Sequence, residues 1–219
     1  MDGIQAEWGQ VNQDAMRSVM RDRSAQFVGR LGWDLCLSPD GLEVDEYDAP
    51  ETTYMVVHEQ FHHVGSCRVR PVRAGTMLVD HFHDAFPEAA SFLAGQERKF
   101  FELTRFCRSP SADAVQIREM LGRLADMLDT FRNDTGISGY LAVVYPEVGR
   151  YLSRIGVRFI RLAASAIDGK TAHLICITDC QDVERAHKTT CGSGHIEVFS
   201  NTDAVPTQIM AQTPAKRAA

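Results

Sequence analysis

The sequence predicts an α/β domain in which strands alternate with helices. Two long helices are expected from apolar residues at helical spacing, over residues 12–31 and 113–133. Short segments rich in β-branched and aromatic residues lie between and after these helices, which is typical of strands. Because strands that alternate with helices pack as layers around a sheet, the pattern favours a layered α/β architecture.

The first predicted helix begins after Asn12, a favourable N-cap residue, and ends at Gly32. Its apolar stripe consists of Met16, Val19, Met20, Phe27 and Leu31. Arg23 falls on the same stripe. Since a buried guanidinium needs an acidic partner, Arg23 predicts a carboxylate supplied by another part of the chain.

A loop rich in Asp, Gly and Pro follows over residues 38–50 and holds the acidic run 43–48. Residues 52–57 and 64–69 are then predicted to be strands, the first from its β-branched content. Residues 100–107, with the sequence FFELTRFC, form a third predicted strand.

The second long helix, residues 113–133, has the clearest pattern. Its stripe consists of Ile117, Leu121, Leu124, Leu128 and Phe131. Gly136 closes this helix.

A compact βαβ unit is expected next. A strand at residues 140–145 leads into a short helix that starts at Pro146 and stops at Gly156, and a strand at 157–163 follows. Residues 172–178 supply one further strand.

Composition favours one globular domain. Of 219 residues, 44% are hydrophobic and 24% charged, so we expect a single domain over residues 1–205 and a loose tail over 206–219. The net charge of −6 argues against nucleic-acid binding. The six cysteines are scattered, so we expect a protein with reduced thiols. The sequence shows no apparent secretion signal and no apolar stretch long enough to span a bilayer. We therefore expect a cytoplasmic protein without stable membrane insertion.

Three polar clusters stand where an ordinary core would not place them. They are Arg23 with Phe27 and Trp33; Asp45 and Asp48 on either side of Tyr47; and Glu102-Leu103-Thr104-Arg105, with Arg68 in the neighbouring predicted strand. Carboxylates would bind a cation and an amine, arginines a carboxylate, and aromatic rings a sulfonium. Together these groups suit a zwitterionic ligand that carries a sulfonium.

The order and spacing of five motifs carry a resemblance. They are R-x3-F-x5-W (Arg23, Phe27, Trp33), E-x-D-x-Y-D (Glu43, Asp45, Tyr47, Asp48), R-x-x-P (Arg68, Pro71), M-L-x-D-x-F (Met77, Leu78, Asp80, Phe82) and E-L-T-R-F from Glu102 to Phe106. In these motifs the chain resembles the acyl-homoserine lactone synthases, the LuxI-type autoinducer synthases. The match is strong over about residues 17–108 and weaker to about 163. Arg70-Pro71-Val72 replaces the usual Leu-Pro-Thr, and Thr104 replaces Ser.

The resemblance implies a fold similar to GNAT acyltransferases, with a mixed, splayed β-sheet, helices on both faces and space for a pantetheine arm. It also implies a two-step reaction. The amine of S-adenosylmethionine attacks an acyl thioester to form an amide. The methionine carboxylate then closes on its own side chain, which releases methylthioadenosine and leaves the lactone.

The resemblance also implies roles for particular residues. The S-adenosylmethionine side would consist of Arg23, Phe27, Trp33, Asp45, Asp48 and Arg105. Glu102 is the first candidate for the base that accepts the amine proton, Asp45 is the second, and Arg68 lies near the chemistry. S-adenosylmethionine is a substrate, so no cofactor is expected.

The acyl donor would be an acyl carrier protein or acyl-CoA. Ala142 and Thr104 are the candidates for the acyl-chain site, and Ala142 stands where relatives that prefer 3-oxo chains carry Thr. Arg150 and Arg154, four residues apart on the short helix, form a candidate docking patch for an acidic carrier. The alternative for Arg150 and Arg154 is a solvated helix face with intrahelical pairing to Glu147.

Two other functions remain open from the sequence. One is a GNAT-like N-acyltransferase that acts on another amine. The other is a zinc-bearing binding module built on Cys176-x3-Cys180-x10-Cys191-x3-His195, a spacing similar to zinc sites. Because Cys176 falls inside an apolar predicted strand, and small buried thiols are common, no metal site is expected.

Overall fold

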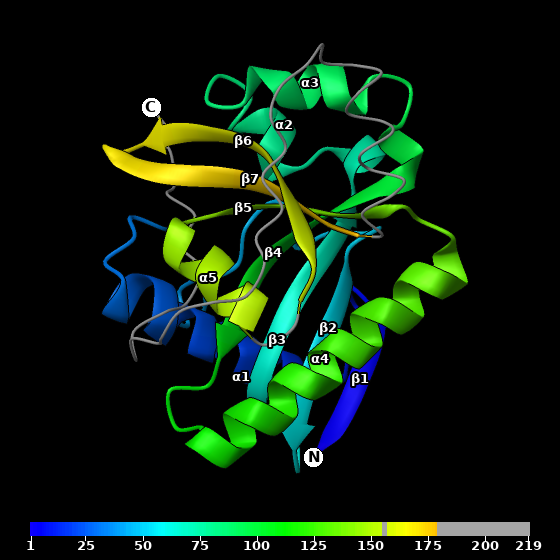
Figure 1. The fold of residues 1–219 in the computed structure, drawn as a ribbon. Helices are drawn as coiled ribbons and strands as arrows, with labels where there is room; N and C mark the ends of the chain where they lie inside the picture. Colours follow the sequence, from blue (N-terminus) through cyan, green and yellow to red (C-terminus); the bar gives the residue numbers. More distant parts are fainter. Residues whose placement is uncertain (155–156, 179–219) are drawn as a thin grey trace. The chain divides into compact units, whose positions relative to one another are not determined.

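The structure is a computed structural model that describes residues 1–154 and 157–178 (Figure 1). The chain divides into two compact units. Unit 1 contains Met1–Arg70 and Leu103–Asp134, and unit 2 contains Pro71–Glu102 and the described residues from Thr135 onward. The predicted tail, residues 206–219, lies outside the described residues.

The first predicted helix forms in unit 1 and changes its winding at Ser24. Helix α1 (Gln13–Arg23) is followed by a π-helical segment, Ser24–Arg30. Asn12 is the N-cap, as predicted, because its Oδ1 accepts hydrogen bonds from the backbone N–H groups of Asp14 (2.9 Å) and Ala15 (3.2 Å). The backbone after the π-helical segment turns at Gly32, whose φ is +69°.

Three strands of unit 1 lie side by side in the sheet: β1 (Asp2–Glu7), β2 (Thr53–Glu59) and β3 (His62–Pro71). Strand β2 is antiparallel to both of its neighbours. Strands β2 and β3 confirm the predicted strands. Strand β1 was not predicted, because its sequence DGIQAE has one β-branched residue and no other strand signal. The register places Tyr54 of β2 opposite Arg68 of β3, which brings both side chains to one face.

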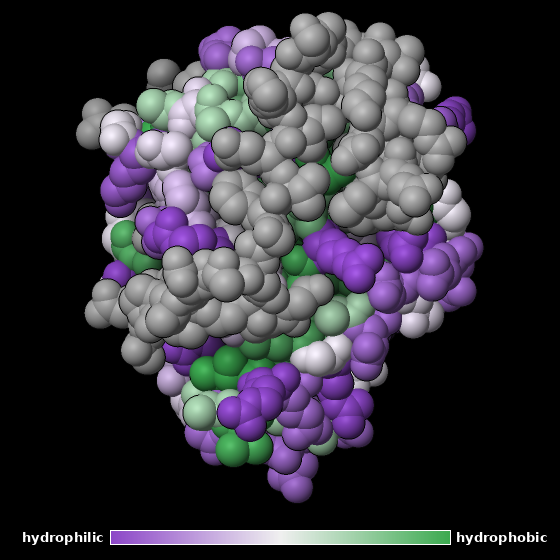
Figure 2. Space-filling model, viewed as in Figure 1, coloured by the Kyte–Doolittle hydropathy of each residue, from purple (hydrophilic) through white to green (hydrophobic). Residues whose placement is uncertain are grey.

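Helices cover both faces of these strands (Figure 1). On one face α1 packs through a buried cluster of Val11, Ala15, Val19, Met20, Tyr54 and Val56. On the other face lies α4 (Ala114–Thr135), the second predicted long helix. The side chain of Met120, on α4, lies against Gly65 of β3. A Cβ atom added at residue 65 would be only 2.5 Å from the Met120 side chain. The outer side of α4 carries both hydrophilic and hydrophobic residues (Figure 2). Glu119 and Arg123 are exposed there, and so is Val115 near the start of the helix.

Unit 2 contains two short helices, α2 (Met77–Asp80) and α3 (Pro87–Leu93), that the sequence did not predict. Both are shorter than the window over which helical periodicity is recognisable. Strand β4 (Phe100–Arg108) confirms the third predicted strand, and its first residues, Phe100–Glu102, pair in parallel with β5 (Gly139–Val144).

The predicted βαβ unit forms with a third strand inserted. Helix α5 (Pro146–Arg154) joins β5 to β6 (Phe159–Ile167), but these strands are not neighbours. Strand β7 (Lys170–Thr178) lies between them and runs antiparallel to both, so β5 and β6 are parallel. Helix α5 packs against this sheet through Val148. The buried cluster around Val148 also contains Ala142, Val144, Phe159 and Ile175.

In the described part of the chain, seven strands form one sheet in the order β1-β2-β3-β4-β5-β7-β6. The sheet is mixed and open, with helices packed on it, which confirms the predicted α/β class. Among the described residues, no helix has the length and apolar character needed to cross a lipid bilayer.

Candidate functional site

Three arginines and three carboxylates are paired inside unit 1. The set, called the charged cluster below, consists of Arg23, Arg68, Arg105, Glu43, Asp45 and Asp48. Formal charge is balanced within this set. Five of the six side chains are almost wholly inaccessible, and Asp45 is the exception, with 13% of its side chain exposed. Asp45 is therefore the most accessible carboxylate of the cluster.

Arg23, the last residue of α1, has the acidic partners that its place on the apolar stripe predicted. Its Nη1 and Nη2 each donate to one oxygen of Asp48, both at 3.1 Å, which is a bidentate pair. Its Nε donates to Glu43. The side chain is fully buried, so these partners replace the water that the guanidinium loses.

Arg68, on β3, binds Asp45 and Asp48. Both aspartates belong to the loop over residues 38–50, which is called the acidic loop below. Its Nη1 lies 2.5 Å from Asp45 Oδ1 and 2.6 Å from Asp48 Oδ1, and its Nη2 donates to Asp45 Oδ2 at 3.0 Å. Its Nε donates to the hydroxyl of Thr104 at 3.0 Å. Thr104, predicted for the acyl-chain site, is therefore also a partner of the charged cluster.

Arg105 completes the cluster from β4. Its Nη2 lies 3.0 Å from Glu43 Oε1 and 2.7 Å from Asp45 Oδ2. Its φ is +50°, in the left-handed region that side-chain-bearing residues seldom adopt. Such a conformation persists where the surroundings hold it, and here two carboxylates do so.

The acidic loop is folded back on itself by its own aspartates. Asp48 Oδ2 accepts from the backbone N–H of Asp45 at 2.9 Å, and Asp45 Oδ1 accepts from that of Tyr47 at 2.9 Å. The N–H of Asp48 donates to the carbonyl of Asp45 at 3.0 Å. These local bonds turn both carboxylates toward the arginines, which explains why Asp residues stand at these positions.

The two aspartates of the cluster have lowered pKa values. Burial raises the pKa of Asp48, but the guanidinium groups of Arg23 and Arg68 outweigh burial and hold it well below its usual range. The pKa of Asp45 is likewise lowered: burial opposes the shift, and Arg68 and Arg105 outweigh burial. Both aspartates are therefore ionised at neutral pH, which suits the binding of cations and makes each a weak proton acceptor.

Tyr54 is a hydrogen-bond partner of the charged cluster that no sequence motif selected. Its hydroxyl accepts from Arg23 Nη1 at 3.1 Å and donates to Asp48. Burial raises the pKa of Tyr54 well above its usual value, so the phenol stays protonated and remains a donor. The signal that could have selected Tyr54 is its position in β2 opposite Arg68. That position is known only once the register between β2 and β3 is known. Glu43 lay inside a recognised motif but was assigned no role.

Aromatic rings border the charged cluster within unit 1. Phe27 and Trp33 are stacked, with ring centroids 4.8 Å apart and planes 7° apart. The guanidinium carbon of Arg105 lies 5.6 Å from the centre of the Phe27 ring, and that of Arg68 lies 5.7 Å from the centre of the Tyr47 ring. Eight predicted site residues thus meet in unit 1: Arg23, Phe27, Trp33, Asp45, Asp48, Arg68, Thr104 and Arg105.

Glu102 belongs to unit 2 and caps α2. Its two oxygens accept from the backbone N–H groups of Met77 (3.0 Å) and Leu78 (2.8 Å). Thr76, the N-cap residue, makes no side-chain cap bond, because Glu102 takes that place. The role of Glu102 as a base stays a prediction, and it requires one oxygen to be shared with the substrate amine.

The remaining predicted site residues also lie in unit 2. Ala142 points into the buried cluster beneath α5. Arg150 is exposed and lies 3.3 Å from Glu147 on the same helix, the intrahelical pairing given above as the alternative. The side chain of Arg154 lies outside the described part of the chain. The docking role of Arg150 and Arg154 stays a prediction.

Metal-ligating side chains do not converge in the described part of the chain, where no group of three or more His, Cys, Asp or Glu residues could hold an ion. Of the zinc-like set, Cys180, Cys191 and His195 lie outside the described residues. Cys176 is buried in β7.

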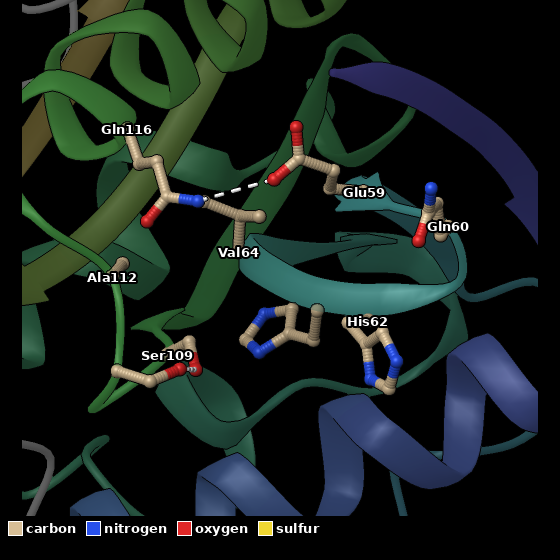
Figure 3. Close-up of a pocket in the computed structure, with 9 residues that line it drawn as sticks. Glu59, Gln60, His62, Val64, Ser109, Ala112 and Gln116 are labelled. Atoms are coloured by element: carbon tan, nitrogen blue, oxygen red, sulfur yellow. Dashed lines mark hydrogen bonds between the residues drawn. The ribbon is translucent and has the colours of Figure 1, made fainter.

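Unit 1 also has a polar surface pocket of about 240 Å³ between the β2–β3 turn and the start of α4 (Figure 3). Its lining includes Glu59, His62, His63, Ser109 and Gln116, and Gln116 Nε2 donates to Glu59 at 3.2 Å. None of the predicted site residues lines this pocket.

Comparison with known proteins gives consistent matches. The family model described as autoinducer synthase matches residues 9–188. An acyl-homoserine-lactone synthase of Rhizobium etli is 31% identical over 159 residues, which is 71% of this chain and 73% of the relative. The structure of TofI in a ternary complex with an inhibitor and MTA superposes with a TM-score of 0.63 at 25% identity, over 86% of this chain and 97% of TofI.

A more distant likeness concerns the fold alone. An acyl-CoA N-acyltransferase from Pseudomonas aeruginosa superposes with a TM-score of 0.56 at 13% identity, over 81% of this chain and all of that protein. This likeness confirms the expected GNAT acyltransferase-like architecture.

Proposed function

Because this chain belongs to the autoinducer synthase family, we propose that it synthesises an N-acyl-homoserine lactone from S-adenosylmethionine and an acyl thioester. The chain is an acyltransferase, and its signal serves quorum sensing. The observation that carries the assignment of the site is the charged cluster, which joins residues of α1, the acidic loop, β3 and β4 in one buried network.

The reaction has two steps in this proposal. The neutral amine of S-adenosylmethionine attacks the thioester carbon, the new C–N bond forms, and the thiol of the donor leaves. The methionine carboxylate then attacks the carbon beside the sulfonium, which closes the lactone and expels methylthioadenosine. MTA bound to TofI agrees with this second product.

The charged cluster would bind the amino-acid part of S-adenosylmethionine. Asp45 is its most accessible carboxylate and stays ionised, so it suits the ammonium or the sulfonium of the substrate. The stacked pair Phe27 and Trp33 offers an aromatic surface for the sulfonium side. The arginines are already paired, so they would bind the substrate carboxylate by sharing donors rather than as unpaired cations.

Glu102 remains the first candidate for the base. A free α-amino group titrates near pH ~8, so only a modest base is needed. The lowered pKa of Asp45 makes it the weaker of the two candidates, and we assign Asp45 to binding. Arg68 orders the acidic loop beside Asp45.

In this scheme S-adenosylmethionine supplies the electrophilic carbon and the nucleophilic amine, so the reaction needs no cofactor. Activity should therefore survive dialysis against a metal chelator. Because S-adenosylmethionine and acyl carrier proteins are metabolites and proteins of the cytoplasm, we also propose a cytoplasmic location.

The test is a reaction of the purified protein with S-adenosylmethionine and either hexanoyl-CoA or a hexanoyl carrier protein. Mass spectrometry should find an acyl-homoserine lactone and methylthioadenosine in equal amounts. Acyl transfer to another amine without methylthioadenosine would contradict the proposal and favour an N-acyltransferase of different specificity. The same experiment identifies the donor.

A further inference from the structure

Arg70 lies on β3 two residues after Arg68, on the same face, yet it binds a different part of the acidic loop. Its Nη1 donates to the backbone carbonyl of Pro50 at 2.7 Å and to the hydroxyl of Thr52 at 2.9 Å. Arg68 therefore binds the carboxylates of the loop, while Arg70 binds the end at which the loop enters β2.

Thr52 connects Arg70 to the centre of the acidic loop. The Thr52 side chain is fully buried, and its hydroxyl donates to the backbone carbonyl of Tyr47 at 2.7 Å. The N–H of Tyr47 in turn donates to Asp45 Oδ1 at 2.9 Å. Three consecutive hydrogen-bonded links thus run from Arg70 through Thr52 and Tyr47 to the most accessible carboxylate of the charged cluster.

The turn between these contacts needs support. Glu51 has a φ of +70°, in the left-handed region, although it carries a side chain. The two acceptors of Arg70, Pro50 and Thr52, stand on either side of Glu51. One guanidinium nitrogen therefore bridges a turn that would otherwise relax toward a more favourable backbone conformation.

We propose that Arg70 is a positioning residue for S-adenosylmethionine, which acts through Thr52 and Tyr47 to hold Asp45 in its binding position. The inference rests on the proposed function of the charged cluster. Along this path Arg70 binds a backbone carbonyl and a hydroxyl, so the proposed effect is on the geometry of the loop.

The test compares Arg70→Met with the wild-type enzyme. Methionine keeps the length and apolar stem of the side chain but has no donor. We expect the KM for S-adenosylmethionine to rise about five- to twenty-fold, as for the loss of one hydrogen bond. kcat should stay within about threefold, and the KM for the acyl donor should not change. Arg70→Lys, which keeps a cationic donor, should recover part of the affinity.

Thr52→Val tests the path, because it removes the hydroxyl with little change in shape. If Arg70 acts through Thr52, the single variants and the double variant Arg70→Met/Thr52→Val should raise this KM by similar factors. Multiplied effects in the double variant would contradict the path. Thr52→Val also serves as the test if Arg70→Met does not fold.

Arg17→Met is the matched control, because Arg17 is an exposed arginine of unit 1 whose partner in a surface pair is Asp40, at 3.1 Å. It removes the same charge and should leave both KM values unchanged. An unchanged KM for S-adenosylmethionine in folded, active Arg70→Met would overturn the inference about Arg70 alone. A wild-type protein that makes no lactone would instead overturn the proposed function.

Discussion

The guanidinium of Arg23 and the carboxylate of Asp48 form a bidentate, buried ion pair with two hydrogen bonds of 3.1 Å. Arg68 and Tyr54 contact the same carboxylate. A buried carboxylate with so many donors is favourable only while all of them are present, since removal of one partner leaves another charge buried without compensation.

This arrangement predicts how stability depends on pH. The pKa of Asp48 is lower in the folded chain than its value of about 3.9 in the unfolded chain. Its contribution is therefore fully present above the unfolded value and is lost as the pH falls through the folded value. Between about pH 4 and pH 2, the free energy of unfolding should fall by up to about 1.4 kcal/mol per pH unit on account of this one group.

Asp48→Asn should remove that part of the slope and should also destabilise the fold by about 3–5 kcal/mol at pH 7. Urea unfolding at several pH values measures both effects. Asp40→Asn, at an exposed carboxylate, is the control. It should change the free energy of unfolding by no more than about 0.5 kcal/mol at any of these pH values. An unchanged slope in Asp48→Asn would show that Asp48 titrates normally.

Glu102→Gln separates the proposed base from the observed helix cap. If Glu102 accepts the amine proton, turnover should fall by about 10²–10⁴-fold at neutral pH. It should recover as the pH rises toward 9, because the amine then loses its proton without help. Loss of the cap alone should lower stability and reduce activity equally at all pH values. Turnover within about threefold of wild type at pH 7 would rule out the role as base.

The absence of a hydroxyl group on Ala142 leads us to predict the type of acyl chain that the enzyme uses. The side chain at this position enters a buried apolar cluster and carries no hydroxyl, so the 3-oxo group of a substrate would find no donor there. We expect lactones without a 3-oxo group, and Ala142→Thr should raise the preference for 3-oxo donors about three- to tenfold. Val144→Thr places the same hydroxyl elsewhere in the cluster and is the control. Mainly 3-oxo products from the wild type, seen by mass spectrometry, would refute this expectation.

Arg150 and Arg154 are tested as a docking patch by charge reversal. The double variant Arg150→Glu/Arg154→Glu should raise the KM for an acyl carrier protein at low salt, and the defect should shrink with ionic strength because exposed charges are screened. The KM for S-adenosylmethionine should not change. Arg17→Glu is the matched control. If the carrier KM is unaffected at low salt, docking occurs elsewhere or the donor is acyl-CoA.

The local elements could be predicted from the sequence because their signals are local. Asn12 caps α1, the stripe around Leu124 forms α4, and Pro146 begins α5, all as expected. Strand β1 and the short helix α2 could not be predicted, because both are too short and too poor in characteristic residues to show a period. The strands β5 and β6 were predicted correctly, but not the place of β7 between them, which depends on pairing at long range.

The sequence by itself selected five of the six residues of the charged cluster, all except Glu43, and the family to which the chain belongs, because motif order and spacing are properties of the chain alone. Only the tertiary structure decided how the cluster is connected. Strand register placed Tyr54 opposite Arg68, and the fold of the acidic loop turned Asp48 toward Arg23. Tertiary structure likewise made Glu102 the cap of α2 and gave Arg70 its contacts with Pro50 and Thr52. The physical reason is that a hydrogen bond depends on distances of about 3 Å between groups far apart in sequence, and those distances exist only in the folded chain.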